Sequence, residues 1–334
     1  MGYQKPIEIK LQLTEKCNFD CGFCFNKQSL SPATKREMPT DAAKSIVSKV
    51  AGEGIKGIRF TGGEPLLHPD LPSLLSQARS LDLKTTLNTN ASLLNKKNAK
   101  AISENVDIAL VSFHSLPLSK AVQKSIRLLS KGDFELKAAT ILTRENIQNL
   151  EKFHDLFQEM PFSQWVLLRQ IPNTLNRSPV SQKDMQLAVE KIAKFNSSRP
   201  KKKHHLIENA LPFCCSNPKK VKKVALGAVH EDGHSNLFVD TSLTIRPSYF
   251  LDVSLGNALQ DSFLNAWNSS FMKRMNSLEF IPEKCHKCKF VLKCMAGSRF
   301  SALFTHNSLY AFDPLANPQN LFSYQKRALG KTWQ

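Results

Sequence analysis

Segments with a strand-like apolar pattern alternate with helix-length amphipathic segments through the N-terminal half of the chain, and this alternation constrains the fold most. The first strand is the clearest, because the apolar residues from Ile7 to Leu13 are separated by single charged or polar residues. The pattern predicts strands at 7–13, 58–61, 83–87, 108–113, 135–142 and 165–169, with helices between them at 40–50, 71–80, 93–103, 119–130 and 147–160. Strands joined by helices pair in parallel, and six units are fewer than a closed barrel needs. We therefore expect an α/β fold built on a partial (β/α)6 barrel.

The pattern and composition of the sequence change near residue 205. A loop with prolines and asparagines and a helix at 185–195 follow the sixth strand, and the basic segment 197–203 has the composition of a linker. Beyond it the patterns indicate short strands and turns, and five of the eight cysteines lie there. We expect two domains: residues 1–205 with the partial barrel, and residues 206–334 as a small cysteine-rich α+β extension.

The composition indicates in which cellular compartment such a chain functions. None of its 334 residues lie in an apolar stretch near the length of about eighteen that a membrane span requires. Met1 to Lys10 has no apolar core of a secretory signal. Eight cysteines in that setting indicate a reducing compartment and metal ligation rather than disulfides. We expect a cytoplasmic protein without a membrane partner.

A net charge of +18 indicates the sign of a partner. Lysines cluster at 201–203 and again at Lys219, Lys220, Lys222 and Lys223. These clusters are a solvated surface or a docking patch for an acidic peptide or a nucleic acid. Neither cluster is interleaved with the aromatic residues of a single-strand binding platform, which disfavours nucleic acid.

Three cysteines follow the first strand as Cys17-x3-Cys21-x2-Cys24. Three thiolates can hold three corners of a cubic iron–sulfur cluster and leave one iron open to a substrate. The alternatives are a zinc knuckle or buried thiols, although no fourth zinc ligand is evident nearby. Soft thiolates favour iron–sulfur clusters or zinc, so spacing alone leaves the metal open.

The segment from Leu13 to Cys24 and the turn Gly62-Gly63-Glu64-Pro65 together resemble the radical S-adenosylmethionine (radical SAM) superfamily. The resemblance implies a [4Fe-4S] cluster on Cys17, Cys21 and Cys24, whose open iron chelates S-adenosylmethionine. It also implies that the glycines allow a close backbone approach and that Glu64 orients the ammonium group of the cofactor. Phe23 would lie near the adenine.

Polar residues at the ends of later strands extend this expected cofactor site. Asn88 and Ser112 are candidates for contacts to the ribose or carboxylate of the cofactor, or else ordinary caps. Arg169 is a candidate for a bidentate pair with the cofactor carboxylate, or else a structural salt bridge. His114 is a candidate base, or else structural.

A second group, Cys285-x2-Cys288-x5-Cys294, resembles the SPASM extension of peptide-modifying radical SAM enzymes, which carries seven cysteines for two auxiliary clusters. Three of those positions differ here, because they hold Ser248, Ser298 and Ala316.

Counting ligands leaves three possibilities for this C-terminal group. The favoured one is a single auxiliary [4Fe-4S] cluster on Cys285, Cys288 and Cys294, either completed by Cys214, Cys215 or another group, or left with an open iron. The others are zinc bound with help from His286, and no metal.

The resemblance implies a radical SAM enzyme that cleaves S-adenosylmethionine reductively. The 5′-deoxyadenosyl radical would then modify a substrate, for which we expect a peptide or protein side chain. An acidic precursor peptide and a one-electron donor of the flavodoxin or ferredoxin type are the expected partners. The alternatives are a tetrapyrrole- or quinone-pathway enzyme, and a degenerate member that binds RNA or a protein without catalysis.

Overall fold

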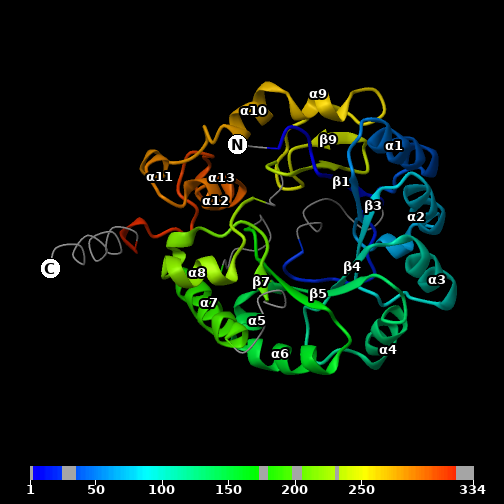
Figure 1. Cartoon of the computed structure of the whole chain (residues 1–334), viewed down its shortest axis with the longest axis horizontal. Coiled ribbons are helices and arrows are strands. Elements are labelled where there is room, and N and C mark those ends of the chain that lie inside the picture. The colour runs from blue at the N-terminus through cyan, green and yellow to red at the C-terminus, as the bar shows by residue number, and fades with distance from the viewer. Residues whose placement is uncertain (1–2, 25–34, 173–179, 198–204, 230–232, 321–334) are drawn as a thin grey trace. The chain divides into compact units, whose positions relative to one another are not determined.

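The chain divides into two compact units in a computed structural model that describes residues 3–24, 35–172, 180–197, 205–229 and 233–320. Both units combine segments that are distant in the sequence (Figure 1). Unit 1 comprises Met1–Thr140, Asp155–Trp165 and Asp232–Ser277, and unit 2 comprises Ile141–His154, Val166–Glu231 and Leu278–Gln334. The proposed boundary at residue 205 remains a prediction about sequence domains.

A mostly parallel sheet forms the centre of unit 1. Its strands are β1 (Glu8–Gln12), β2 (Gly57–Thr61), β3 (Lys84–Thr89), β4 (Ile108–Ser112), β5 (Glu135–Leu142, whose last two residues fall in unit 2), β8 (Asn236–Val239), β9 (Thr244–Arg246) and β10 (Gly256–Asn257). Their order is β10-β9-β8-β1-β2-β3-β4-β5. β8 pairs in parallel with β1, whereas β9 and β10 pair antiparallel.

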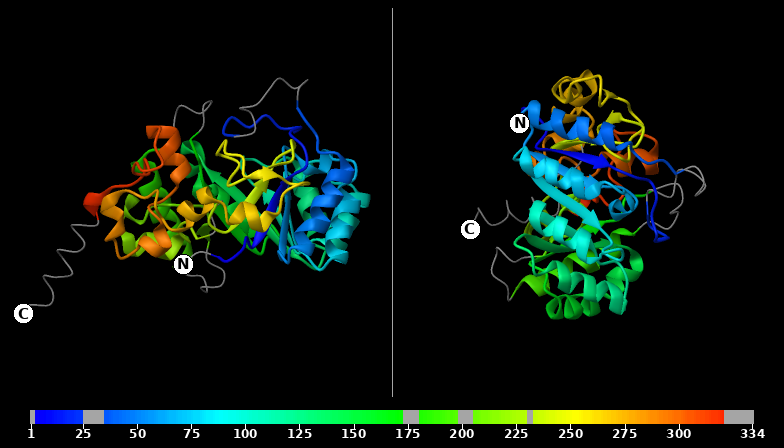
Figure 2. Two further views of the ribbon diagram at one scale, coloured as in Figure 1. Left: turned by 90° about the horizontal axis from the view of Figure 1, so that it is seen from above. Right: turned by 90° about the vertical axis from the view of Figure 1, so that its right-hand side faces the viewer.

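Helices cover one face of this sheet. They include α1 (Thr40–Gly52), α2 (Leu71–Ser80), α3 (Lys96–Asn105) and α4 (Lys120–Leu129), which lie outside the strands in Figure 1. Figure 2 shows the same helices, coloured blue to cyan, stacked side by side. Ile9 and Leu11 are completely buried, whereas Glu8 and Lys10 on the opposite face of β1 are half-buried. This alternation is the one that the sequence predicts for a strand with an apolar face toward helices.

Shorter elements complete unit 1. They are the turn η3 (Pro65–Leu67), α9 (Phe263–Trp267), α10 (Ser270–Asn276) and the C-terminal half of α6 (Leu150–Glu159). No helix in the described ranges combines the length and apolar character needed to cross a membrane.

Unit 2 is mainly helical around one short parallel strand pair. β6 (Gln164–Arg169, whose first two residues fall in unit 1) pairs with β7 (Leu206–Ile207). The other elements are α5 (Arg144–Gln148), α7 (Gln182–Asn196), η5 (Phe213–Cys215), α8 (Pro218–Val224), α11 (Glu283–His286), α12 (Val291–Cys294) and α13 (Arg299–His306).

The six predicted strands are confirmed, and the helices differ from expectation mainly at their ends. The helix predicted at 147–160 is two helices, because Thr143 caps α5 and Asn149 leaves the helical conformation before α6. The helix predicted to start at 93 starts at Lys96, because Asn95 and Asn98 form a reciprocal capping box there. Side chain to backbone hydrogen bonds of this kind set helix ends more sharply than apolar periodicity does.

One buried hydrogen-bonded chain connects three strands of the core of unit 1. Trp165, which is 0% exposed, donates its indole N–H to the Thr140 hydroxyl at 2.8 Å. The same hydroxyl donates to the carbonyl of Phe113. The rings of Phe113 and Trp165 also meet edge to face, with centroids 6.4 Å apart.

Replacing Thr140 by Val should destabilise the protein, because the Trp165 N–H would stay buried without an acceptor. Such a group costs about 1–3 kcal/mol, which chemical denaturation would measure. The matched control is the double variant Thr140→Val/Trp165→Phe, which removes the donor as well. Its loss should be smaller than the sum of the two single losses, and simple additivity would contradict the proposed dependence.

Candidate functional site

The Gly62-Gly63 turn is joined by its backbone to the segment that leads into Cys17. The Gly63 N–H donates to the carbonyl of Thr14 at 2.6 Å, and the Glu64 N–H donates to that of Lys16 at 2.8 Å. A Cβ atom on Gly63 would lie 2.1 Å from the Lys16 oxygen, and one on Gly62 would lie 2.6 Å from the Thr14 oxygen. The close approach that these glycines permit in this structure is therefore to the chain's own backbone.

Glu64 holds this turn against the end of β3. Its side chain is buried, and its carboxylate accepts hydrogen bonds from the Leu66 N–H at 3.1 Å, the Thr89 hydroxyl at 2.6 Å and the Asn90 N–H at 2.7 Å. Burial raises the pKa of Glu64, and the three donors oppose that rise. Pro65 begins η3 directly after it.

At this strand end the sequence indicated Asn88 but not Thr89 or Asn90. Strand parity was the available signal for Thr89, because neighbouring residues of a strand face opposite ways. Asn90 donates its backbone N–H, which side-chain parity does not predict. Asn88 accepts a hydrogen bond from Arg59 at 3.3 Å, and Arg59 also pairs with Glu8 at 2.9 Å. Thr89 and Asn90 instead hold Glu64.

The cysteine loop is anchored by polar contacts rather than by regular structure. Asn18 accepts a hydrogen bond from the Asn90 amide at 2.9 Å and donates one to the Ser92 hydroxyl at 2.8 Å. Cys17, Cys21 and Cys24 are all partly exposed. Burial raises the pKa of Cys17, to which the nearby Glu64 and Cys24 also contribute.

Nothing in the described ranges forms a group of three His, Cys, Asp or Glu side chains close enough for one metal ion. The thiolates that hold a four-iron cluster lie farther apart than the ligands of a single metal ion. The partly exposed thiols of Cys17, Cys21 and Cys24 on a single anchored loop suit such a cluster.

Phe23 and His114 meet beside this loop. Their rings lie edge to face, with centroids 5.1 Å apart. Burial lowers the pKa of His114 to about 4, so the imidazole is neutral at pH 7. Ser112, at the end of β4, is half-buried two residues before His114. The structure therefore brings residues predicted from two distant motifs to one place in unit 1.

Arg169 lies in unit 2, where it forms a buried salt bridge. Its guanidinium contacts the Asp313 carboxylate at 2.5 Å, and the two side chains are 1% and 0% exposed. It also donates to the carbonyl of Ala210 at 3.1 Å. Asp313 in turn accepts hydrogen bonds from the backbone of Ser298 and Leu315. Of the two expectations for Arg169, the structural salt bridge is present.

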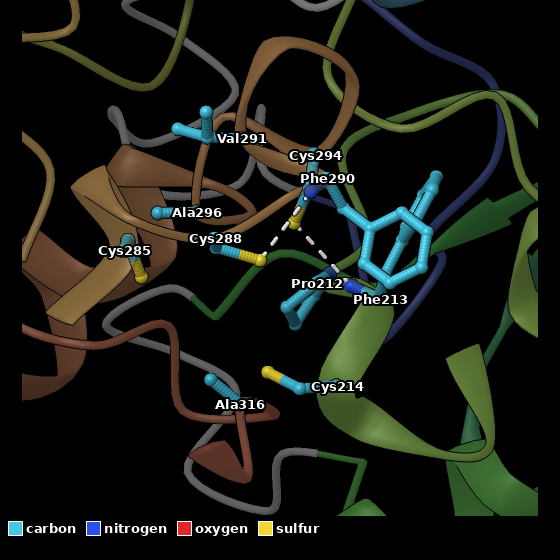
Figure 3. A pocket seen from close by; sticks show the side chains of 10 residues that line it. All are labelled: Pro212, Phe213, Cys214, Cys285, Cys288, Phe290, Val291, Cys294, Ala296 and Ala316. Atoms are coloured by element: carbon cyan, nitrogen blue, oxygen red, sulfur yellow. Dashed lines mark hydrogen bonds between the residues drawn. The ribbon is translucent and has the colours of Figure 1, made fainter. Parts of the chain in front are cut away.

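Four cysteines from two separate segments of the chain line one pocket in unit 2 (Figure 3). They are Cys214, Cys285, Cys288 and Cys294, and Ala316 lines the same pocket. Figure 3 shows the sulfur of Cys214 turned into the pocket, beside Ala316. Cys215 is completely buried and does not line it, and burial raises the pKa of its thiol, to which the nearby Cys214 and Asp313 also contribute.

The described hydrogen bonds include a backbone N–H donor to two of these four sulfurs. Cys294 accepts from Phe213 at 3.3 Å, and Cys288 accepts from Phe290 at 3.5 Å. Burial raises the pKa of Cys214 and Cys294 to about 12 and that of Cys285 to about 11. Such amides stabilise thiolates and tune iron–sulfur clusters, so the donor set fits an auxiliary cluster.

The other residues weighed for this site lie elsewhere. His286 is exposed on α11 and does not line the pocket. Ser298 is buried as the N-cap of α13, where its hydroxyl accepts from the Ser301 N–H. Ser248 belongs to unit 1, where its hydroxyl accepts from the Phe250 N–H at 3.1 Å.

One of the two basic clusters can be described. Lys219, Lys220, Lys222 and Lys223 are exposed around α8, and Lys220 pairs with Glu190 at 2.6 Å. The cluster at 201–203 lies outside the described residues.

Solved structures share the fold of this chain. SuiB of Streptococcus suis bound to S-adenosylmethionine has a TM-score of 0.75 at 16% identity, over 94% of this chain and 78% of SuiB. Native anSMEcpe with bound AdoMet and Cp18Cys peptide has a TM-score of 0.73 at 18% identity, over 98% of this chain and 99% of anSMEcpe. At these identities the similarity concerns the fold.

Sequence comparison identifies the family. An AdoMet-dependent heme synthase of Methanosarcina barkeri is 24% identical over 325 residues, which cover 89% of this chain and 92% of the synthase. The radical SAM superfamily matches residues 11–157, which hold the end of β1, the cysteine loop, the Gly62–Pro65 turn and β2 to β5. Residues 11–157 therefore form a domain of the radical SAM superfamily, whose members are enzymes.

Proposed function

We propose that the chain holds a [4Fe-4S] cluster with an open iron on Cys17, Cys21 and Cys24, cleaves S-adenosylmethionine reductively, and modifies a peptide or protein side chain. The observation that carries this proposal is the anchored loop. Its three partly exposed thiols follow β1, and the backbone segment just before Cys17 is hydrogen-bonded to the Gly62–Pro65 turn. When bound, the cluster and S-adenosylmethionine together supply one-electron chemistry that can remove a hydrogen atom from carbon.

The chain's own residues bind and orient the cofactor. The Glu64 Oε2 atom accepts one described hydrogen bond, from the Asn90 N–H, so it has room for a second donor such as the ammonium group of the cofactor. Phe23 offers an aromatic surface for the adenine. Asn88 and Ser112 are candidates for the ribose or carboxylate. Arg169 is not assigned to the cofactor. Its guanidinium forms a salt bridge with the Asp313 carboxylate and so holds Asp313 in place.

Two observations support a peptide as substrate. The fold matches that of anSMEcpe, a structure that contains a peptide. The chain also carries a net charge of +18, with exposed lysines around α8, which suits an acidic precursor peptide. A one-electron donor of the flavodoxin or ferredoxin type would supply the reducing equivalent.

The second candidate is a cofactor-pathway enzyme acting on a tetrapyrrole. The heme synthase match favours it, because that match spans 89% of the chain and therefore includes the C-terminal region.

The C-terminal pocket supports one auxiliary [4Fe-4S] cluster on Cys285, Cys288, Cys294 and Cys214. Cys214 is favoured over Cys215 because its thiol lines the pocket, whereas Cys215 does not. The Asn320 side-chain amide donates to the Cys214 carbonyl at 2.9 Å.

Anaerobically reconstituted protein should release 5′-deoxyadenosine when it receives S-adenosylmethionine and a one-electron reductant. Cys17→Ala should abolish that product, because the variant lacks one cluster ligand, whereas Cys215→Ala should retain it. Liquid chromatography measures the product. Equal yields from the Cys17→Ala variant and the parent protein would overturn the proposed ligand set.

Iron content tests the fourth auxiliary ligand. If both proposed sites hold a [4Fe-4S] cluster, the protein should contain about eight irons per chain. Cys214→Ala should lower that number toward about four. Adding Ala316→Cys to Cys214→Ala should restore it, because Ala316 lines the same pocket. Cys215→Ala is the matched control. Loss of iron in Cys215→Ala with retention in Cys214→Ala would reverse the assignment.

Substrate class is testable by mass spectrometry. A short acidic peptide encoded beside this chain should change mass after incubation with the reconstituted enzyme, and the change should weaken as salt screens the charge attraction. An iron-containing tetrapyrrole with carboxylate side chains serves as the competing substrate. Conversion of the tetrapyrrole with an unchanged peptide would favour the second candidate.

A further inference from the structure

The turn that follows β8 lies at the same edge of the sheet as the start of the cysteine loop. β8 pairs in parallel with β1, with Val239 in register with Leu11. The carboxyl ends of parallel strands meet at one edge of a sheet, so residues 240–243 come beside the segment that leads into the cysteine loop. Thr241 and Glu15 are 226 positions apart in the sequence, yet both belong to unit 1.

The segments on either side of the cysteine loop pair with each other. The Met38 N–H donates to the carbonyl of Leu13 at 2.8 Å, and the Glu15 N–H donates to that of Arg36 at 2.9 Å. The Glu15 side chain adds a further bond across this pair, because its Oε2 atom accepts the Arg36 N–H at 3.1 Å. This pairing closes the base of the loop that carries the three N-terminal cysteines.

The turn after β8 contacts both sides of this base. Thr241 is buried, and its hydroxyl donates to the Oε1 atom of Glu15 at 2.9 Å. The Arg36 guanidinium donates to the hydroxyl of Ser242. Since Glu15 uses its other carboxylate oxygen for the Arg36 N–H, one side chain links the turn to both ends of the loop.

Asp240 fixes the shape of this turn independently of the loop. Its Oδ1 atom accepts the N–H groups of Ser242 at 2.9 Å and Thr244 at 3.0 Å. Its Oδ2 atom forms a salt bridge with Arg246 at 2.7 Å. An aspartate that binds the backbone two residues ahead holds the chain in a tight turn, so Thr241 is presented to Glu15 by a hydrogen-bonded scaffold.

We propose that Thr241 and Glu15 are positioning residues for the N-terminal thiolate loop, and that the turn after β8 clamps the base of this loop so that its thiols stay together. This inference rests on the cluster proposed on Cys17, Cys21 and Cys24. Contacts behind the ligands of a metal site orient those ligands and commonly change its affinity by about ten- to a hundredfold. A segment close to the C-terminal cysteines in sequence would thus serve the N-terminal site.

The test uses the full, anaerobically reconstituted chain. Thr241→Val removes the hydroxyl with little change in shape, whereas Thr241→Ser keeps a hydroxyl. Thr85→Val is the matched control, because Thr85 is a completely buried threonine of unit 1 whose hydroxyl donates to the Leu83 carbonyl at 3.1 Å. Thr85 lies near the start of β3, at the other end of that strand from Thr89.

The measurement is electron paramagnetic resonance of the reduced protein. Only an iron without a protein ligand is open to S-adenosylmethionine, so the part of the spectrum that changes when the cofactor is added reports the N-terminal cluster. The decay of this cofactor-dependent signal in the presence of an iron chelator gives the rate at which the loop loses its cluster.

The signal of Thr241→Val should decay about tenfold faster than that of the parent. Thr241→Ser and Thr85→Val should decay at about the parent's rate, although Thr85→Val also loses a buried hydroxyl. Decay at the parent's rate in Thr241→Val, or equal acceleration in Thr85→Val, would overturn the inference.

Glu15→Gln is the second variant, and it decides the question if Thr241→Val does not fold. Its amide keeps one acceptor oxygen where the carboxylate offers two, so either the Thr241 hydroxyl or the Arg36 N–H faces an NH2 group. Its signal should also decay faster, and decay at the parent's rate would contradict the clamp. A parent protein without any cofactor-dependent signal would instead overturn the proposed N-terminal cluster, so the two failures are distinguishable.

Discussion

The buried carboxylate of Glu64 is the contact on which the N-terminal site depends. It receives donors from η3 and from the end of β3, while the turn that carries it pairs with the backbone before Cys17. The described part of the cysteine loop, residues 17–24, has no helix or strand, so these bonds fix the start of the loop. Burial of an ionised carboxylate is unfavourable unless it is hydrogen-bonded, which explains why three donors converge on a single side chain.

The C-terminal pocket follows the same principle with different donors. Its thiols come from two separate segments, and the backbone amides of Phe213 and Phe290 donate to two of their sulfurs. The salt bridge between Arg169 and Asp313 fixes the segment before Ala316, since Asp313 also accepts the Ser298 and Leu315 amides. Both sites therefore rely on a buried carboxylate that organises loops through backbone N–H groups.

The two sources of similarity bear on different questions. The match of residues 11–157 to the radical SAM superfamily concerns the part of the chain where S-adenosylmethionine chemistry starts. The likeness to SuiB and anSMEcpe concerns the fold. Substrate choice depends on surfaces and loops that vary independently of the fold, so a peptide and a tetrapyrrole are both compatible with this architecture.

The sequence by itself determined the strand–helix alternation, the parallel sheet and the N-terminal motifs, because period-two patterns and short motifs are local properties. Helix ends such as Asn95 and Asn149 departed from expectation because caps override periodicity. Only the tertiary structure showed that Cys214, and not Cys215, lines the pocket with Cys285, Cys288 and Cys294, and that Thr89 and Asn90 donate to Glu64. Neighbouring residues point in different directions, and which of them reaches a site depends on segments far away in the chain.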